Sequence, residues 1–460
     1  MKITQSVIIL MVFGLLTISS AEELHAQGTT AVVQSPVQFS ASYEMPEFVS
    51  ESSDSLLSAY IDTALSRNPA LREAFESWVA SETLPDQMGA LPDPEVMFSY
   101  YLNPMSYDGV FSQAALGVMQ MFPWPGVRSE SRQYANLLAA SRRENVEQTR
   151  IEIQREVMIV WFELVTLNRL EGYLREHLNW VTRLESVTTS RYETGFATRS
   201  DIIRLEIERA EITAELRTLA TDIAGIEARF NALLNRSHDT EIILPEGRTD
   251  ITFDSDSIAR TDRSVWLNHP SVREADLLIR AGESMQRQAQ FGKYPMIGVG
   301  AEIMGSNYLM QMEDGSTPVV ANFRITIPIW RKSVNARIEQ SKADIRMYGH
   351  RKEMALQQLE SDLARFLADY NRAHQNVTLY QQQLLPRSRE LTDLLLLDYS
   401  STRATLDEVI SARRRSVDYA IELETAIRNR NTAVAELISL FESSTETVKP
   451  GEYGATSSDD

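Results

Sequence analysis

The sequence predicts a mainly helical protein with a small membrane β part, organised as two internal repeats. Three observations support this fold class. The phrase RYETGFATRSDII at 191–203 returns as DYSSTRATLDEVI at 398–410. Apolar residues recur every seven positions through long stretches of both halves, a spacing typical of helices that supercoil against their neighbours. Two segments of each half instead alternate apolar and polar residues, which predicts a β-hairpin.

The N-terminus predicts export. A lysine, the apolar run 7–18 and the small residues 19–21 have the order of a secretory signal peptide, 1–21. Cleavage is expected after Ala21 or, as second choice, after Ala26. A membrane anchor is the alternative, but the run is shorter than the roughly 20 residues of a helical span. A flexible segment, 22–53, follows. Because the chain has no cysteine, a lipid anchor on cysteine is excluded, as are disulfides and thiolate sites.

Composition excludes several functions. The formal net charge of −19 argues against nucleic acid as a partner, because phosphates attract a basic face. The sequence has no P-loop, no GxSxG elbow and no HExxH, and its six histidines are scattered singly. We therefore expect no catalytic residue, cofactor or bound metal ion. His177 is expected to be structural, and Gly298 and Gly300 are expected to serve close strand packing.

The first repeat is expected over 54–236. A helical pattern at 54–88 ends at LPDPE, whose prolines cannot both lie inside a helix. A hairpin at 95–123 has one apolar face, formed in its first strand by Val96, Phe98, Tyr100 and Leu102. A helix from Ser129 to Tyr192, about 95 Å long, then reaches a tip at 193–198, beyond which a second helix returns. The heptad positions of the two helices are Val146, Ile153, Val160, Leu167, Leu174, Val181, Leu205, Ile212, Leu219, Ile226 and Leu233.

A linker, 237–268, with a possible short strand at 241–244, precedes the second repeat, 269–441. HPSVREA at 269–275 matches NPALREA at 68–74. The hairpin, 294–330, has a return strand with Phe323, Ile325 and Ile327 on one face and Asn322, Arg324 and Thr326 on the other. Pro386 predicts a local kink in the next long helix. After the tip at 400–405, a last helix runs to 441, and the acidic tail 442–460 is expected to be disordered. The heptad positions expected in the long helix are Leu356, Leu363, Tyr370, Val377, Leu384 and Leu391.

Both tips carry helix-capping signals. Thr198 with Asp201, and Thr405 with Glu408, have the spacing of a capping box, in which the two side chains satisfy free N–H groups at a helix start. Gly195 can adopt the positive φ that ends the incoming helix. The second tip has a threonine at the corresponding position, 402, so its turn geometry is open.

The residue pattern of both hairpins is typical of membrane-spanning strands. One apolar and one polar face is the pattern of a sheet between lipid and a water-filled lumen. Trp124 and Trp330 stand where each hairpin meets its helix, and Tyr100 and Tyr101 stand at the other end of the first hairpin, as in interfacial aromatic girdles. A soluble hairpin packed on the helices is the alternative. Four strands cannot close a barrel, so several chains would have to contribute.

From about Asp54 to Phe441 the chain resembles the TolC family of outer-membrane efflux proteins. The resemblance rests on the order and spacing of LPDPEVMFSYYLNP, GVMQMFPWPGVRSE, RYETGFATRSDII and LLPRSRELTDLLLLDYSSTRATLDEVISAR. It implies a homotrimer with a twelve-stranded β-barrel in the outer membrane, four strands per protomer, and long coiled-coil helices that form an α-barrel in the periplasm. It also implies an adaptor protein in the periplasm and an inner-membrane pump, of the RND type, as partners.

The resemblance also implies site residues. Segments 103–113 and 305–319 would be outward loops, and 237–268 with the C-terminal tail would form an equatorial belt. The tips would dock the adaptor through Gly195, Phe196, Thr198, Thr402, Arg403 and Thr405. The acids that narrow the channel entrance would be Asp201, Asp407 and Glu408. Their capping role alone is the alternative explanation.

The cargo stays open. Methionines at 97, 105, 119, 121, 296, 304, 310 and 312 suggest passage of soft metal ions, although methionine near apolar strands commonly serves packing. A passive exit duct for efflux is the main expectation, with a heavy-metal duct or a type I secretion duct as alternatives. A periplasmic coiled-coil scaffold that conducts nothing is the rival from another class.

Overall fold

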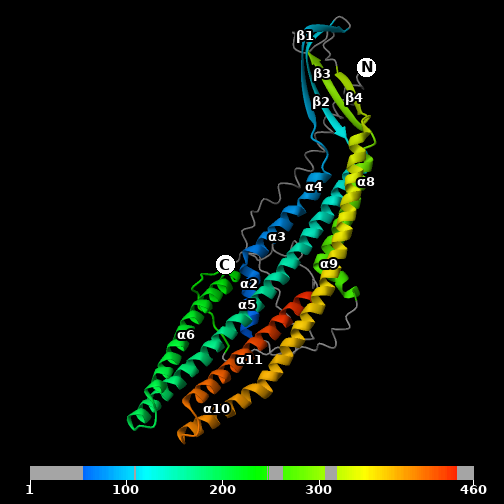
Figure 1. The fold of residues 1–460 in the computed structure, drawn as a ribbon. Coiled ribbons are helices and arrows are strands. Elements are labelled where there is room, and N and C mark those ends of the chain that lie inside the picture. The colour runs from blue at the N-terminus through cyan, green and yellow to red at the C-terminus, as the bar shows by residue number, and fades with distance from the viewer. Residues whose placement is uncertain (1–54, 108–109, 246, 248–262, 306–318, 443–460) are drawn as a thin grey trace, which may run out of the picture. The chain divides into compact units, whose positions relative to one another are not determined.

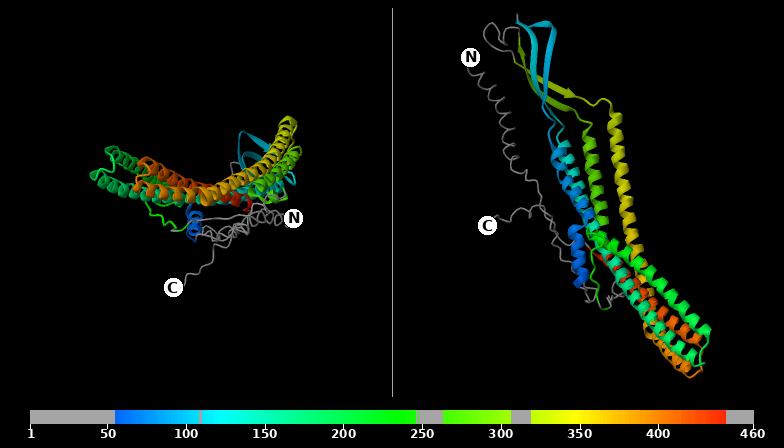
Figure 2. Two further views of the ribbon diagram at one scale, coloured as in Figure 1. Left: turned by 60° about the horizontal axis from the view of Figure 1, so that its bottom comes forward. Right: turned by 90° about the vertical axis from the view of Figure 1, so that its left-hand side faces the viewer.

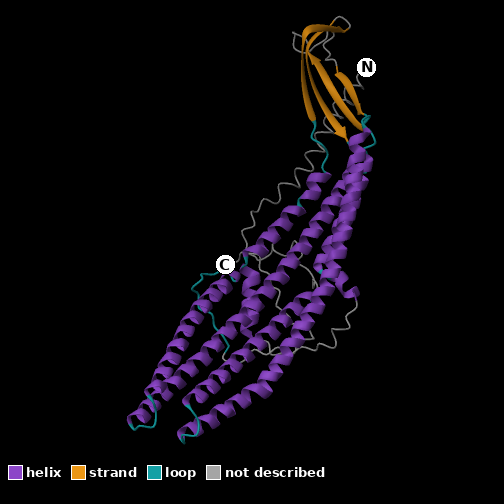
Figure 3. Cartoon of the chain, in the orientation of Figure 1, coloured by secondary structure: helices purple, strands orange, loops and turns teal. Residues whose placement is uncertain are grey.

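The computed structural model describes residues 55–107, 110–245, 247, 263–305 and 319–442. The expected signal peptide, the segment 22–53, most of the loop 305–319 and the tail beyond residue 442 lie outside these residues. The described chain forms one four-stranded sheet, with long helices extending away from it (Figures 1 and 3).

Three short helices come first, as the pattern at 54–88 predicts. They are α2 (Ser55–Arg67), α3 (Pro69–Glu82) and α4 (Leu84–Gly89). The side chain of Asn68 caps α3 by accepting the Ala70 N–H at 2.9 Å, ahead of the proline in the first turn. All three helices lie along α5. The chain leaves them at LPDPE and enters the sheet.

The sheet joins the two hairpins in the order β1-β2-β3-β4, and every neighbouring pair is antiparallel. Its strands are β1 (Glu95–Tyr107), β2 (Val110–Phe122), β3 (Met296–Gly305) and β4 (Val319–Thr326). The prediction of a loop over 103–113 is wrong in extent, because most of these residues belong to β1 and β2. The register of β1 against β2 shifts between Tyr100 and Met105, where Asn-Pro interrupts the alternation, and pairing resumes beyond the proline. An irregularity is where a proline is tolerated in a strand.

The long helices include α5 (Val127–Glu193), which has 67 residues and is about 100 Å long. The second long helix is continuous through three parts: α9 (Arg331–Leu379), the π-helical turn η2 (Tyr380–Leu384) and α10 (Leu385–Ser400). The remaining elements are α6 (Arg199–Leu233), the 3₁₀ helix η1 (Arg263–Asn268), α8 (Pro270–Phe291) and α11 (Leu406–Phe441). These bounds confirm two predictions, the long helix over 129–192 and the last helix that ends at Phe441.

The helices pack side by side. Helix α5 contacts α6, α8 and α11, while α11 also contacts α9 and α10. Figure 2 shows these long helices as a curved layer in its left view. Among the largest fully buried side chains are Trp161, Phe162, Phe230 and Trp266. The predicted heptad residues of α5 are buried except for Leu167, which is half-buried.

The π-helical turn changes the heptad register in the second long helix. Tyr370 and Val377 are buried at their heptad positions. Beyond them the buried positions are Leu385, Ser388, Thr392 and Tyr399, and Leu385, Thr392 and Tyr399 continue the stripe of Val377. A π turn inserts one residue, so the spacing becomes eight once and then seven again. The expected heptad positions Leu384 and Leu391 therefore lie off the buried stripe: Leu384 is half-buried and Leu391 is half exposed. Pro386 stands at the start of α10, directly after this turn.

The short strand expected at 241–244 is also wrong. These residues, all of which the structure describes, form no strand. The N–H of Ile243 instead donates to the hydroxyl of Tyr60 on α2 at 2.9 Å. In the part of the chain that the structure describes, none of the strands β1 to β4 pairs with this segment.

Candidate functional site

The two helix tips have the same backbone geometry. Gly195 has φ of +81°, and the N–H of Phe196 donates to the carbonyl of Arg191 at 2.8 Å. Thr402 has φ of +58°, and the N–H of Arg403 donates to the carbonyl of Asp398 at 2.8 Å. A left-handed residue followed by a bond that spans six residues is the Schellman motif that ends helices. The open question of the second tip is therefore resolved, since its threonine adopts the conformation that glycine favours.

Thr402 should carry backbone strain, because a β-branched residue rarely adopts positive φ. We expect Thr402→Gly to stabilise the protein by about 1 kcal/mol, after the added chain entropy of glycine in the unfolded state is subtracted. Thermal unfolding followed by circular dichroism measures the change. The adjacent Ser401 has φ of −95°, so Ser401→Gly is the control and should not stabilise. Equal effects of the two changes would contradict strain at 402.

Both predicted capping boxes are complete. The N–H of Asp201 donates to the Thr198 hydroxyl at 3.3 Å, and the N–H of Thr198 donates to the Asp201 carboxylate at 2.9 Å. The second box repeats this arrangement. The N–H of Glu408 donates to the Thr405 hydroxyl at 3.3 Å, and the N–H of Thr405 donates to the Glu408 carboxylate at 2.8 Å. The backbone N–H of Thr405 and its hydroxyl lower the pKa of the Glu408 carboxyl. Two of the three expected entrance acids therefore also cap helices.

The third acid, Asp407, joins the two tips. Its carboxylate pairs with Arg204 of α6 at 2.5 Å, and both side chains are exposed. Arg191 of α5 makes a second link, because its guanidinium lies 4.6 Å from the ring centre of Tyr399 and donates to the Ser400 carbonyl at 3.3 Å. The apolar cluster beneath these links comprises Val181, Leu184, Leu205, Ile212, Tyr399, Leu406, Val409 and Ile410.

Most of the expected docking residues are exposed, and Phe196 is 69% exposed at its tip. Gly195 and Thr402 form the turns, while Thr198 and Thr405 hold the caps. Arg403 pairs with Asp398 at 2.8 Å and keeps an exposed side chain. Phe196 and Arg403 are thus the two side chains of the set that the turn backbone and the capping boxes do not use.

An ionic cluster that the sequence did not predict is centred on the buried side chains of Glu208 and His177. Glu208 of α6 contacts His177 of α5 at 3.2 Å and pairs with Arg414 of α11, which also pairs with Glu211 at 2.8 Å. Burial alone would raise the pKa of the Glu208 carboxyl, but hydrogen bonds from His177 and Arg414 lower it overall. The structural role expected for His177 is confirmed. The cluster escaped prediction because its members come from three different helices.

The sheet has two unlike faces. The outer face, of Val96, Phe98, Leu116, Val118, Val299, Phe323 and Ile325, is apolar and exposed, with Phe323 76% exposed. The inner face carries Glu95, Glu302, Asn322 and Arg324. Arg324 of β4 pairs with Glu95 of β1 at 3.4 Å, across two intervening strands. Such strands would be about 14 Å apart in a flat sheet, so this contact indicates that the sheet curls towards its inner face.

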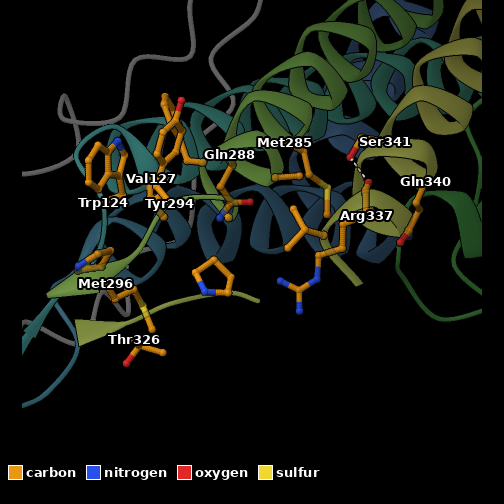
Figure 4. A pocket seen from close by; sticks show the side chains of 16 residues that line it. Trp124, Val127, Met285, Gln288, Tyr294, Met296, Thr326, Arg337, Gln340 and Ser341 are labelled. Carbon is orange, nitrogen blue, oxygen red and sulfur yellow. Dashed lines mark hydrogen bonds between the residues drawn. The ribbon is translucent and has the colours of Figure 1, made fainter. Parts of the chain in front are cut away.

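The expected girdle residues differ in exposure. Trp330 is 83% exposed and Tyr100 is also exposed, whereas Tyr101 is half-buried. Trp124 stacks on Tyr294, with ring centres 4.7 Å apart. A cavity of about 470 Å³ adjoins Trp124 where the hairpins meet α5, α8 and α9 (Figure 4); its lining includes Val127, Met285, Phe291, Met296 and Arg337.

Within 55–107, 110–245, 247, 263–305 and 319–442 there is no group of three or more His, Cys, Asp or Glu side chains that could hold a metal ion. Among the helices of that same part of the chain, none is both long and apolar enough to cross a membrane.

Comparisons with known proteins give a fold. No protein-family model matches the sequence, and no curated protein matches it. Solved structures do match. The outer membrane protein VceC of Vibrio cholerae has a TM-score of 0.71 at 17% identity, over 85% of this chain and 97% of that one. The MtrE outer membrane channel of Neisseria gonorrhoeae has a TM-score of 0.68 at 17% identity, over 87% of this chain and 97% of that one.

A membrane protein from Pseudomonas aeruginosa is similar too, with a TM-score of 0.73 at 17% identity, over 88% of this chain and 100% of that one. These matches cover the helices and the sheet together. The chain therefore has the fold of bacterial outer-membrane channels, as its resemblance to the TolC family implies.

Proposed function

We propose that this chain is the subunit of a passive outer-membrane exit duct in a tripartite efflux system. The observation that carries the proposal is the pair of unlike sheet faces, apolar and exposed outside, polar inside. That is the pattern of a membrane sheet around a water-filled lumen. The shared fold with structures described as outer membrane channels supports the proposal, and it favours a duct over an enzyme.

We propose a homotrimer. Four strands leave open edges that lipid does not tolerate, and three copies give the twelve strands of the resembled family. Two long helices, α6 and α10, each expose a row of apolar residues near the tips: Ile203 and Ile207 on α6, and Leu391, Leu394 and Leu397 on α10. A ring of identical copies closes when one edge of a copy meets the other edge of the next. The two rows are the proposed contact, and the helices would then line an α-barrel in the periplasm.

The parts of the chain take roles in this assembly. Repeats 54–236 and 269–441 would each supply one hairpin and one tip, with 237–268 as the equatorial belt. Trp330, Trp124, Tyr100 and Tyr101 would lie at the membrane interfaces. The protein would be exported by its signal peptide to the outer membrane and would carry no lipid anchor. A pump in the inner membrane, of the RND type, would drive cargo into the duct.

At the tips, we propose that Asp407 contributes most to a ring of negative charge at the channel entrance, with Asp201 and Glu408 beside it. The carboxylates of Asp201 and Glu408 are held by their capping boxes, whereas that of Asp407 is opposed by one exposed arginine. Breaking the Arg204–Asp407 pair would release Asp407 towards a passing cation.

Planar bilayers test the duct. Detergent-purified trimers should insert and conduct potassium ions in discrete steps. A protein that stays soluble without detergent and shows no conductance would support the rival scaffold function and contradict the duct.

The exposed tip residues give a test of docking. Phe196→Glu is expected to abolish crosslinking to the periplasmic adaptor, because an exposed phenylalanine would anchor in an apolar pocket that excludes a charge. Trimers and conductance should be unchanged. The control is Tyr192→Glu, an exposed aromatic residue on the last turn of α5, which should retain crosslinking. Loss of trimers in the Phe196 variant would instead indicate a structural role.

A further inference from the structure

The cavity of about 470 Å³ beside Trp124 combines aromatic groups with one arginine (Figure 4). Trp124 and Tyr294 stack with their ring planes 12° apart. In the view of Figure 4 these rings lie towards one end, Arg337 lies towards the other, and Met285 lies between them. Pockets for small molecules have volumes of roughly 300–1,000 Å³ and apolar walls with a few polar groups. The cavity therefore has the size and the kind of lining that suit a small ligand.

Arg337 gives the cavity a positive charge. Among the described residues that line the cavity, Arg337 is the one charged side chain. Glu339, the nearest acid along α9, pairs with Lys342 at 2.9 Å. In the part of the chain that the structure describes, the guanidinium of Arg337 makes no ion pair or hydrogen bond. In a protein with a net charge of −19, a cationic cavity of this kind is suited to an anionic ligand.

Two other polar side chains of the lining already have partners. The side-chain amide of Gln288 donates to the hydroxyl of Ser131 at 2.7 Å. The hydroxyl of Ser341 donates to the backbone carbonyl of Arg337 at 2.9 Å, the dashed line in Figure 4. The guanidinium therefore remains as the strongest donor that a ligand can bind. Its planar fork of N–H groups matches the oxygens of a carboxylate, sulfonate or phosphate group.

The cavity adjoins the inner face of the sheet. Thr326 and Met296, which both line it, oppose each other in the pairing of β4 with β3. Thr326 stands two positions from Arg324 on β4, so alternation along the strand puts both on the inner face. In the proposed duct this face borders water, whereas the apolar outer face borders lipid. A ligand would therefore enter the cavity from the aqueous side.

We propose that this cavity binds a small amphipathic anion, a molecule with an aromatic or apolar body and one acidic group. The body would pack against Trp124 and Met285, and the acidic group would accept hydrogen bonds from Arg337. Entry from water rests on the proposed duct, while binding itself requires only the cavity. Because the cavity lies where the hairpins join α5, α8 and α9, an occupant would contact the sheet and the helices together.

Naphthalene-2-sulfonate is the probe, because it joins a two-ring aromatic body to one anionic group and dissolves in water. Isothermal titration calorimetry of the detergent-purified protein, with the heat of titration into detergent alone subtracted, measures the affinity. We expect about one site per chain, with a dissociation constant on the order of 0.1 mM for so small a ligand. The cation 2-naphthylmethylammonium, which has the same rings and the opposite charge, should bind about tenfold more weakly or less.

Arg337→Gln should weaken binding by about tenfold or more, because a charge-assisted hydrogen bond is lost. The matched control is Arg346→Gln, which removes an exposed arginine of the same helix outside the cavity lining and should leave the affinity unchanged. Ala289→Phe places a ring in the apolar part of the cavity and should block binding while Arg337 stays in place. Unchanged affinity in Arg337→Gln, equal loss in Arg346→Gln, or wild-type affinity in an Ala289→Phe protein with native circular dichroism would overturn the site.

A phospholipid is the other source of an amphipathic anion. Phosphatidylglycerol added to the detergent should leave the affinity for naphthalene-2-sulfonate unchanged, because the ligand is expected to come from water. A loss of affinity of about tenfold would mean that lipid occupies the cavity, and would overturn the proposal of a water-borne ligand.

Potassium conductance in planar bilayers separates this proposal from the duct itself. Wild-type protein that conducts potassium but does not bind naphthalene-2-sulfonate overturns the anion site and leaves the duct standing. Protein that binds the probe through Arg337 but does not conduct supports the site and contradicts the duct.

Discussion

Trimers are expected to fall apart when either Ile207→Arg or Leu391→Glu is introduced, and to reform when both changes are present in one chain. Ile207 of α6 is 53% exposed and Leu391 of α10 is 50% exposed. Ile207 lies eight residues beyond the start of α6 at Arg199, and Leu391 lies nine residues before the end of α10 at Ser400. The two residues therefore stand at similar distances from their tips.

The double variant is expected to form trimers again because each proposed interface joins α6 of one copy to α10 of the next. In a closed ring each interface joins unlike edges of two copies, so every interface of the double variant would contain one introduced arginine and one introduced glutamate. A single buried charge in an apolar contact is strongly unfavourable, whereas a pair in contact offsets much of that cost. A contact of like edges would bring arginine against arginine, and the double variant would remain monomeric.

Size-exclusion chromatography with light scattering in detergent measures the oligomeric state. The control is Glu215→Arg, which adds an arginine to the exposed polar surface of α6 and should leave trimers intact. Single variants that remain trimeric would contradict the proposed edges, even if the duct proposal holds.

Leu391 illustrates how far the sequence predicts this fold. Periodic signals predicted the long helices, the hairpins and both capping boxes, because each depends on residues within a few positions of one another. The heptad also predicted that Leu391 is buried. One π-helical turn before Pro386 shifts the register, and nothing in a seven-residue pattern reveals an inserted residue. The exposed leucine row of α10 is a consequence of that shift.

In the candidate site, too, the sequence predicted only contacts between residues close together in the chain. The Thr198–Asp201 and Thr405–Glu408 boxes were predictable, since their partners are three residues apart. The Arg204–Asp407 pair and the cluster of His177, Glu208 and Arg414 were not, because helices distant in sequence bring these side chains together.

Acid is expected to destabilise the protein through His269, the N-cap of α8. Its Nδ1 atom accepts the Ser271 N–H at 3.3 Å, and burial lowers the pKa of its imidazole to about 4. An unfolded histidine has a pKa of about 6.5. The folded state therefore favours the neutral ring, and the associated stability is complete above pH 6.5 and decreases as pH falls towards 4. At pH 5 the loss is about 2 kcal/mol.

His269→Asn should remove most of this loss. The equivalent helix start in the first half has Asn68, whose side chain accepts the Ala70 N–H, so asparagine provides a cap that does not titrate in this range. Thermal midpoints at pH 7.5 and pH 5 measure the effect by circular dichroism. The wild type should lose more stability between these values than the variant, while His350→Asn, at an exposed position of α9, should behave as the wild type. Equal acid sensitivity of wild type and His269→Asn would mean that protonation of the cap costs the fold nothing, and would locate the acid response in other groups.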